Sequence, residues 1–176
     1  MTIHSIPLPA AAWYPSNDAS SFASARIQLK QSSVAVPSPR YLEWIFDTTA
    51  TEYLLCDFIV PQNFVSTPSV RVYYKMTTGI ANEVMWGVAL AAVTDGDAQD
   101  MDADAFASTG ATATVTVPGT AGYLDVATIS ISTADDDGMV AGDHLNLLLF
   151  RDPAGPGSDA DSDAEFLGAD FRYADS

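Results

Sequence analysis

The chain has 176 residues, which is enough for one compact domain with a substantial core and a tight fit for two. Its 23 acidic and 7 basic residues give a formal net charge of −16. This charge argues against nucleic acid and anionic membranes as partners, because phosphate groups are bound by clustered Lys and Arg. Asp far outnumbers Glu, and Lys occurs only twice, a bias that indicates either adaptation to high salt or a GC-rich genome.

The opening segment differs in composition from the rest of the chain. Residues 1–38 are rich in Pro, Ser and Ala, and they contain one strand-like run, Ala25 to Lys30. Residues 36–39 include two prolines and predict an extended hinge, since Pro restricts both itself and the residue before it. We therefore predict an N-terminal extended arm over 1–38, which lies on the domain or reaches a neighbouring subunit, and one domain over 39–176. The first residues have no basic region and no continuous apolar stretch, so we expect no signal peptide.

From Tyr41 onward, apolar and polar residues alternate in eight short runs, each bounded by Gly, Pro, Asp or Ser. A period of two is that of a strand with one buried face. Eight such strands with regularly spaced turns predict an all-β fold, a single jelly-roll-like β-sandwich of about eight antiparallel strands. The residues that share the apolar face of each run are Leu42, Trp44 and Phe46; Leu54, Cys56, Phe58 and Val60; Val70, Val72, Tyr74 and Met76; Val84, Trp86, Val88 and Leu90; Val115 and Val117; Ala127, Ile129 and Ile131; Leu145, Leu147 and Leu149; and Leu167, Ala169, Phe171 and Tyr173.

The same alternation assigns expected positions to individual side chains. Trp44 and Trp86 are in phase with their apolar neighbours, so we expect both in the core. Cys56 is the only cysteine, which rules out an intramolecular disulfide and predicts a buried, inert thiol. Lys75 is in phase with Arg71 and Tyr73, and these three residues are expected to face out from the core.

Clusters of Asp occupy the loops between the runs and suggest a cation site. Asp159, Asp161 and Asp163 have the one-three-five spacing that places carboxylates around Ca²⁺, and position twelve of the same count is Asp170. The loop departs from the EF-hand pattern because Ala164 stands where Gly is needed, and no helices flank it. We therefore keep two possibilities, a calcium site at these four residues and loose cation binding without fixed geometry, and we predict no other cofactor.

Catalytic signatures are weak in this sequence. There is no Gly-x-Ser-x-Gly motif, and neither His4 nor His144 has a partner motif. Glu52 and Glu83 flank apolar strands and are the best candidates for the acid pair of a glycosidase. Their simpler interpretation is as solvated charges at strand ends, so we predict no catalytic residue and no enzyme.

An aromatic pair, Trp13 and Tyr14, lies outside the predicted strands. Such a pair in a polar segment needs a surface to bury against, and a second subunit would supply one. We therefore predict a homo-oligomer, possibly a trimer, that uses these two residues for attachment. The tryptophans and tyrosines also allow an alternative, a sugar-stacking platform on the β-sandwich.

From Tyr41 to Tyr173 a series of short motifs follows the strands in a fixed order. They are Phe46-Asp47-Thr48-Thr49, Glu52, Phe58-Ile59-Val60-Pro61 with Asn63-Phe64, Val72-Tyr73-Tyr74, Val84-Met85-Trp86, Ala91-Ala92-Val93, Val117-Pro118-Gly119, Ala141-Gly142-Asp143, Arg151-Asp152 and Phe166-Leu167-Gly168-Ala169. This order of features resembles a group of jelly-roll structural proteins found among the virion genes of tailed viruses. The resemblance implies a capsid decoration or head-spike protein on the virion surface, and it brings no catalytic residues with it.

Taken together, these features predict a non-enzymatic virion structural protein on the capsid exterior. Its expected partners are further copies of itself and the major capsid protein or other virion proteins, without nucleic acid or membrane. The first alternative is the receptor- or glycan-binding head of a tail fibre. The second is a carbohydrate-active hydrolase that uses Glu52 or Glu83.

Overall fold

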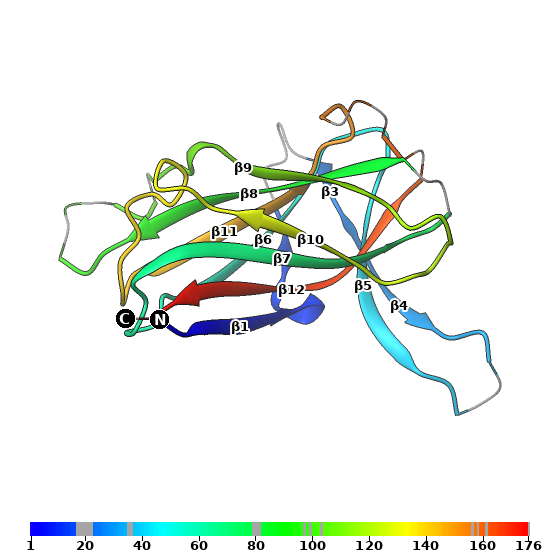
Figure 1. Ribbon diagram of the computed structural model, residues 1–176, viewed down its shortest axis with the longest axis horizontal. Helices are drawn as coiled ribbons and strands as arrows, with labels where there is room; N and C mark the ends of the chain where they lie inside the picture. The colour runs from blue at the N-terminus through cyan, green and yellow to red at the C-terminus, as the bar shows by residue number, and fades with distance from the viewer. Residues whose placement is uncertain are drawn as a thin grey trace.

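The computed structural model shows a chain folded as two packed β-sheets (Figure 1). It describes residues 1–16, 23–34, 37–78, 82–96, 98, 100–102, 104–155, 157, 159–160 and 162–175. The elements are β1 (Ile3–Pro9), the 3-10 turn η1 (Ala10–Ala12), β2 (Tyr14–Pro15), β3 (Ala23–Ser24), β4 (Arg26–Gln31), β5 (Arg40–Phe46), β6 (Glu52–Ile59), β7 (Ser66–Met76), β8 (Glu83–Val93), β9 (Ala107–Thr116), β10 (Asp125–Ser130), β11 (His144–Arg151) and β12 (Ala164–Ala174).

Each sheet contains six strands. Sheet A has the order β10-β7-β12-β5-β4, and β1 pairs with the other end of β12. Sheet B has the order β2-β6-β11-β8-β9, and β3 pairs with β6. All pairings are antiparallel except the two-residue contact between β3 and β6. The predicted all-β sandwich is therefore confirmed.

The eight alternating runs correspond to the eight strands from β5 to β12, and the run Ala25–Lys30 corresponds to β4. One phase was predicted wrongly, because Phe166 is fully buried and Leu167 is not. A β-bulge between Phe166 and Gly168 shifts the register of β12 by one residue. Gly168 has φ +145°, and a Cβ there would lie 3.1 Å from the Leu8 carbonyl oxygen, so this position favours glycine.

In its described part, the opening segment lies on the domain. β1 pairs with β12 over seven residues, from Ile3–Ala174 to Pro9–Gly168. β4 pairs with β5, so residues 26–31 also belong to sheet A. Of the two arrangements expected for an arm over 1–38, the structure therefore has the segment packed on its own domain. Residues 17–22 and 35–36 lie outside the described residues.

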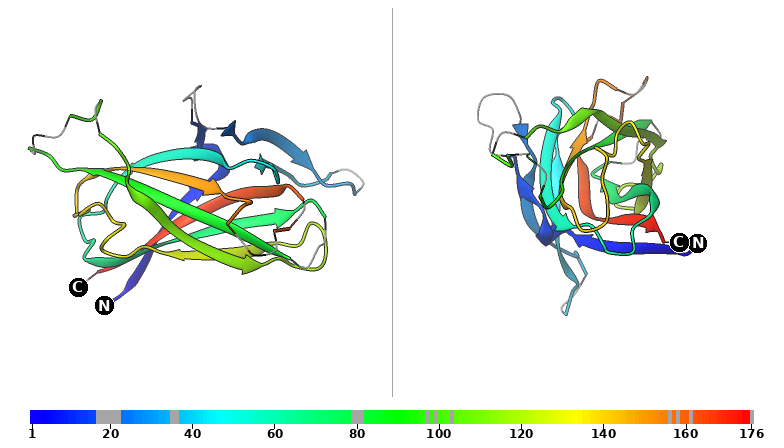
Figure 2. Two further views of the ribbon diagram at one scale, coloured as in Figure 1. Left: turned by 90° about the horizontal axis from the view of Figure 1, so that it is seen from above. Right: turned by 90° about the vertical axis from the view of Figure 1, so that its left-hand side faces the viewer.

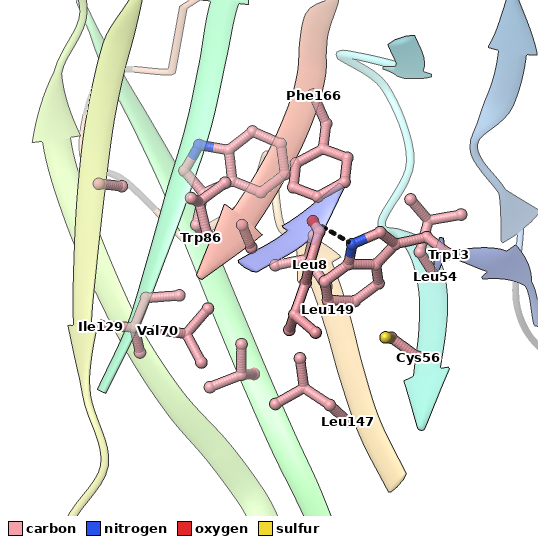
Figure 3. Close-up of a cluster of buried hydrophobic side chains, with 14 of the residues drawn as sticks. Leu8, Trp13, Leu54, Cys56, Val70, Trp86, Ile129, Leu147, Leu149 and Phe166 are labelled. Atoms are coloured by element: carbon pink, nitrogen blue, oxygen red, sulfur yellow. Dashed lines mark hydrogen bonds between the residues drawn. The ribbon is translucent and has the colours of Figure 1, made fainter. Parts of the chain in front are cut away.

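The core lies between the two sheets and is rich in aromatic rings (Figure 3). Trp86 packs edge-on against Phe46 with ring centroids 5.0 Å apart, and Phe166 touches both rings. Trp44 and Trp86 are buried, as predicted. Cys56 is also buried, and burial raises the pKa of its thiol to about 11, which agrees with the expected inert thiol.

The two ends of the sandwich differ. Figures 1 and 2 show the hairpin of β4 and β5 projecting beyond the sandwich at one end, while the β8–β9 loop and both termini lie at the other. The termini are tied together, since the Asp175 N–H donates to the Thr2 carbonyl at 3.1 Å. Among the described residues the helical element is η1 alone, and no helix there is long and apolar enough to cross a membrane.

Candidate functional site

A groove lies on the outer face of sheet A, beside the projecting hairpin. Two adjoining hollows of about 300 and 580 Å³ form it, and Tyr41, Lys75 and Gly122 line both. One wall is the hairpin, which contributes Ser32 and Pro39. The other wall is the loop before β10, which is fixed to β7 because the Gly122 N–H donates to the Met76 carbonyl at 3.0 Å.

Charged residues from three neighbouring strands form the floor of the groove. Lys75 of β7 binds Glu165 of β12, and its Nζ lies 2.9 Å from an oxygen of Glu43 of β5. Lys30 Nζ lies 3.6 Å from Glu165 at the rim. Gln28 donates a further hydrogen bond to Glu43. Two carboxylates therefore face two ammonium groups, and the floor carries no net charge.

The floor is buried to a degree that is unusual for the outer face of a sheet. Glu43 is 0% exposed and Lys75 is 7% exposed, so Lys75 faces out from the core, as predicted, but is covered on that outer face. Burial lowers the pKa of Lys75 below its ordinary value of 10.5, and the bond to Glu43 opposes this shift. The cause is the fold itself, because the hairpin and the 117–124 loop rise on both sides of β7.

An aromatic ring stands over this floor. Tyr41 is 37% exposed, and Lys75 Nζ lies 5.8 Å from its ring centroid. Leu124 and Leu167 continue the apolar surface, while Gln31 and Thr77 add polar groups at the edge. A concave surface with an accessible ring, aliphatic neighbours and a few hydrogen-bonding groups is suited to binding a small polar ligand with one apolar face.

Beyond the groove, the outer face of sheet A carries a second ion pair. Arg71 of β7 binds both carboxylate oxygens of Asp170 on β12, and Ser5 of β1 donates a hydrogen bond to the same carboxylate at 2.8 Å. Burial would raise the pKa of Asp170, but the hydrogen bonds from Arg71 and Ser5 outweigh it, so the pKa lies below 3.8. This pair joins three strands and has a structural role.

The outer face of sheet B is built differently. Phe150 lies across Gly87, where a Cβ would fall inside its ring, and Tyr53 packs beside it with centroids 5.8 Å apart. Tyr14 donates a hydrogen bond to Asp57 at 3.1 Å, and His144 Nε2 lies 3.6 Å from the same carboxylate. Burial and the bond to Asp57 raise the pKa of Tyr14 to about 12, so its hydroxyl stays protonated and acts as a donor.

Trp13 and Tyr14, the aromatic pair expected at a subunit contact, lie in different environments in the structure, one buried and one exposed. Trp13 is buried in its own core, where its Nε1–H donates to the Leu8 carbonyl at 3.1 Å and its ring meets Phe166 edge-on (Figure 3). The surface that Trp13 needs is therefore supplied by its own chain, because β1 and η1 fold back over the sandwich. Tyr14 remains 40% exposed at the edge of sheet B. The predicted oligomer stays a prediction.

Of the four residues proposed for calcium, the three that the structure describes, Asp159, Asp163 and Asp170, do not group as metal ligands. Asp159 accepts hydrogen bonds from the buried Arg151 and from Thr48, each at 3.2 Å. Asp170 is occupied by Arg71, and the Asp163 carbonyl accepts the Thr77 N–H. Asp161 lies outside the described residues. In the part of the chain that the structure describes, no three His, Cys, Asp or Glu side chains group as metal ligands.

Of the two acids proposed for hydrolysis, Glu52 takes a structural position through its side chain, and Glu83 makes a structural contact through its backbone carbonyl. Glu52 accepts the Asp47 N–H at 2.5 Å and so closes the turn between β5 and β6, and burial raises its pKa. Glu83 begins β8, where its carbonyl accepts the Ala160 N–H at 2.7 Å. His4 binds Asp175 at the paired termini. Each of these contacts stabilises a turn or a strand end.

Sequence reasoning missed the groove, although one signal for it was present. The chain places most of its acids in loops as Asp, whereas all four Glu lie in strands. Glu43 and Glu165 are two of these, and Lys75 is one of only two lysines. A long carboxylate or ammonium side chain inside an alternating strand needs a partner on a neighbouring strand, and that requirement pointed to a buried charge cluster.

Comparisons with known proteins bear on the fold. No family model matches the sequence, and no curated protein matches it. Among solved structures, a family 35 carbohydrate-binding module from Cellvibrio japonicus Abf62 has a TM-score of 0.50 at 9% identity, over 98% of this chain and 95% of that one. An Arthrobacter globiformis isomalto-dextranase complexed with panose has a TM-score of 0.51 at 12% identity, over 96% of this chain but only 23% of that one. The chain shares their fold.

The match therefore spans nearly all of an isolated carbohydrate-binding module and about a quarter of a much larger enzyme. At such identities the likeness establishes the β-sandwich and leaves function to the site. Neither structure is a virion protein, so the resemblance stated from the sequence gains no support from them.

Proposed function

We propose that the chain is a non-catalytic glycan-binding module whose binding site is the groove beside Tyr41. The observation that carries this proposal is an accessible aromatic ring over a buried, charge-neutral floor in a concave site. The shared fold with a family 35 carbohydrate-binding module supports the proposal without deciding it. It corresponds to the glycan-binding alternative raised by the sequence.

The chemistry of the groove fits a sugar. The C–H face of a pyranose packs on an aromatic ring, and Tyr41 offers such a ring next to Leu124 and Leu167. Hydroxyl groups at the edge of the sugar can bond to Gln31, Thr77 and the serines of the hairpin wall. Because the floor charges are paired and the chain carries −16, the groove favours uncharged sugars over anionic ones.

The arrangement of the carboxylates supports binding without catalysis. A glycosidase needs two carboxyl groups in contact with the scissile bond, one of them able to donate a proton. In this groove Glu43 is completely buried, and Lys75 engages both Glu43 and Glu165. Neither acid is positioned to approach a bound sugar as a free general acid.

A glycan array followed by calorimetry on the best ligand tests this function. Replacing Tyr41 with Ala should weaken binding at least about tenfold, since a central aromatic anchor contributes about 1.4 kcal/mol or more. Tyr14→Ala is the matched control, because Tyr14 has a similar exposure of 40% but lies on sheet B. Equal losses in the two variants, or no binding to any glycan, would refute the assignment.

The virion location implied by the sequence resemblance remains a separate prediction. A glycan-binding head on a tail fibre is the version of it that agrees with the proposed site. If the chain is a tail-fibre head, mass spectrometry of purified virus particles from the source should detect it at a stoichiometric level.

A further inference from the structure

Three of the seven basic residues are concentrated in one segment of the chain, and the groove does not explain this distribution. Residues 26–42 contain Arg26, Lys30 and Arg40 and no acidic residue, although the whole chain carries −16. We call this segment, β4 with the start of β5, the basic hairpin. Of the four remaining cations, Lys75 and Arg151 are buried, Arg71 is bound to Asp170 and Arg172 is half-buried. Lys30 faces Glu165 at the groove, but Arg26 and Arg40 are exposed, so the basic hairpin holds most of the accessible positive charge.

The basic hairpin also exposes apolar side chains. Ile27 and Leu29 pair in register with Trp44 and Leu42, so they lie on the face of sheet A that elsewhere covers the core. They are nevertheless 51% and 66% exposed, because the hairpin projects past the end of sheet B (Figure 1). An apolar face of this kind on a soluble domain indicates a contact surface.

A complementary surface lies at the opposite end of the same molecule. A hollow of about 350 Å³ is lined by Ile59, Val93, Met101 and His144, with Asp95 at its edge. We call it the acidic socket. Ile59 and Met101 are 58% and 53% exposed, and Asp100 and Asp102 of the same β8–β9 loop are exposed as well. The socket thus combines apolar side chains with carboxylates of the same loop, and its charge is the reverse of that of the hairpin.

We propose that the basic hairpin of one chain docks into the acidic socket of a second copy of the same chain. The two surfaces lie at opposite ends of the long axis in both Figures 1 and 2, so they cannot meet within one molecule. The hairpin and the socket carry opposite charge, and both expose apolar side chains. These complementary properties identify a second copy of the chain as the occupant of the socket. The contact is head-to-tail, and repetition closes a ring or extends a filament.

Pairing between two β4 edges is the competing arrangement. β4 forms an edge of sheet A, and exposed edges can pair between molecules. Arg26 and Lys30 oppose this mode, because two such edges would bring like charges together. Edge pairing also leaves Ile27 and Leu29 uncovered, whereas the socket covers them.

The test uses two exposed residues that lie outside the groove. Leu29→Asp places a carboxylate in the apolar surface of the hairpin, and Met101→Asp places one in the socket. Both positions tolerate a polar residue because they are exposed. Association is measured by sedimentation in about 0.15 M salt, because salt at this concentration screens the repulsion between the negatively charged molecules. We expect the wild type to grow beyond the 18.6 kDa monomer with concentration, and each variant alone to stay monomeric.

The mixture of the two variants decides the arrangement. Leu29→Asp retains its socket and Met101→Asp retains its hairpin, so an equimolar mixture should form two-chain complexes and nothing larger. Self-association of Met101→Asp alone would show hairpin-to-hairpin pairing and overturn the proposal. A wild type that stays monomeric up to about 1 mM would overturn it as well.

A charge exchange gives an independent check. Arg40→Glu and Asp95→Arg should each weaken association by about three- to tenfold, and combining them should restore part of it. Glycan binding, measured in parallel, should not change in Leu29→Asp or Met101→Asp. The docking proposal and the groove proposal can therefore fail separately.

Discussion

The two outer faces of the sandwich show two ways of burying residues that a strand pattern assigns to solvent. On sheet A, Lys75, Glu43 and Glu165 are buried beneath the walls of the groove, and Lys75 together with Lys30 at the rim balances the two carboxylates. On sheet B, Gly87 is covered by the ring of Phe150, and Ala89 and Ala91 are buried beside it. The buried residues on the outer face of sheet A are charged and lie beneath loops. Those on the outer face of sheet B are small and apolar.

The difference shows that burial on an outer face follows from what stands beside the strand. On sheet B, Gly87 is covered by the Phe150 ring of the neighbouring strand, so no charge is desolvated there. On sheet A the hairpin rises from the sheet, and the residues at its base need paired charges once water is excluded. Only the second arrangement leaves an open groove above a polar floor.

The largest effect is expected at Lys75. In Lys75→Met the two glutamates remain buried without a compensating charge, and we expect a loss of about 3 kcal/mol or more in the free energy of unfolding. Urea unfolding at neutral pH measures it. Lys30→Met is the control, since Lys30 Nζ lies at the rim and its removal should cost less than about 1 kcal/mol.

An additional variant separates charge from packing at the same place. Adding Glu43→Gln and Glu165→Gln to Lys75→Met removes the uncompensated charges and should recover most of the loss. Equal stability of Lys75→Met and Lys30→Met would contradict the idea that the floor of sheet A depends on paired charges.

A smaller effect, which depends on pH, is expected at Asp170. The pKa of this carboxyl is lower in the folded chain than its ordinary 3.8, so its contribution is complete above that pH and is lost as the pH falls through the folded pKa. Asp170→Asn should therefore lower stability by about 1–2 kcal/mol at pH 7. The gap between variant and wild type should close in strongly acidic solution, and a gap that stays constant down to pH about 2 would exclude the linkage.

The smallest effect is expected on sheet B. Gly87→Ala should cost about 1 kcal/mol, because Phe150 must lift from the strand to make room for a Cβ. In a Phe150→Ala background the same substitution should be neutral or stabilising, since Ala loses less backbone entropy than Gly. A double-mutant cycle by thermal unfolding measures the coupling, and additive effects would mean that ring and glycine are independent.

Local patterns in the sequence predicted most of the strands. The runs around Trp44, Trp86 and Val72 alternate cleanly, and each corresponds to a strand with the expected inward face. β1 was not predicted because Pro7 and Pro9 argue against a strand. It forms at the edge of sheet A, where β12 supplies the partner. That partner lies more than 150 residues away and leaves no local trace.

The candidate site was less predictable than the fold. Tyr41, Lys75 and Glu165 come from three separate strands and meet only because β12 pairs with both β5 and β7. The bulge at Gly168 reverses the phase of β12, which changes the residues that face the groove. Trp13 was expected at a subunit contact because its own core was not visible from the sequence.

The pairing of Thr2 with Asp175 has a practical consequence for joining this domain to others. A polypeptide fused to either end starts from the same corner, remote from the projecting hairpin of β4 and β5 (Figure 1). Circular permutants with a short bridge between the ends should therefore fold, and so should insertion of the whole domain into a host loop. In each case the groove beside the hairpin would lie away from the joined ends.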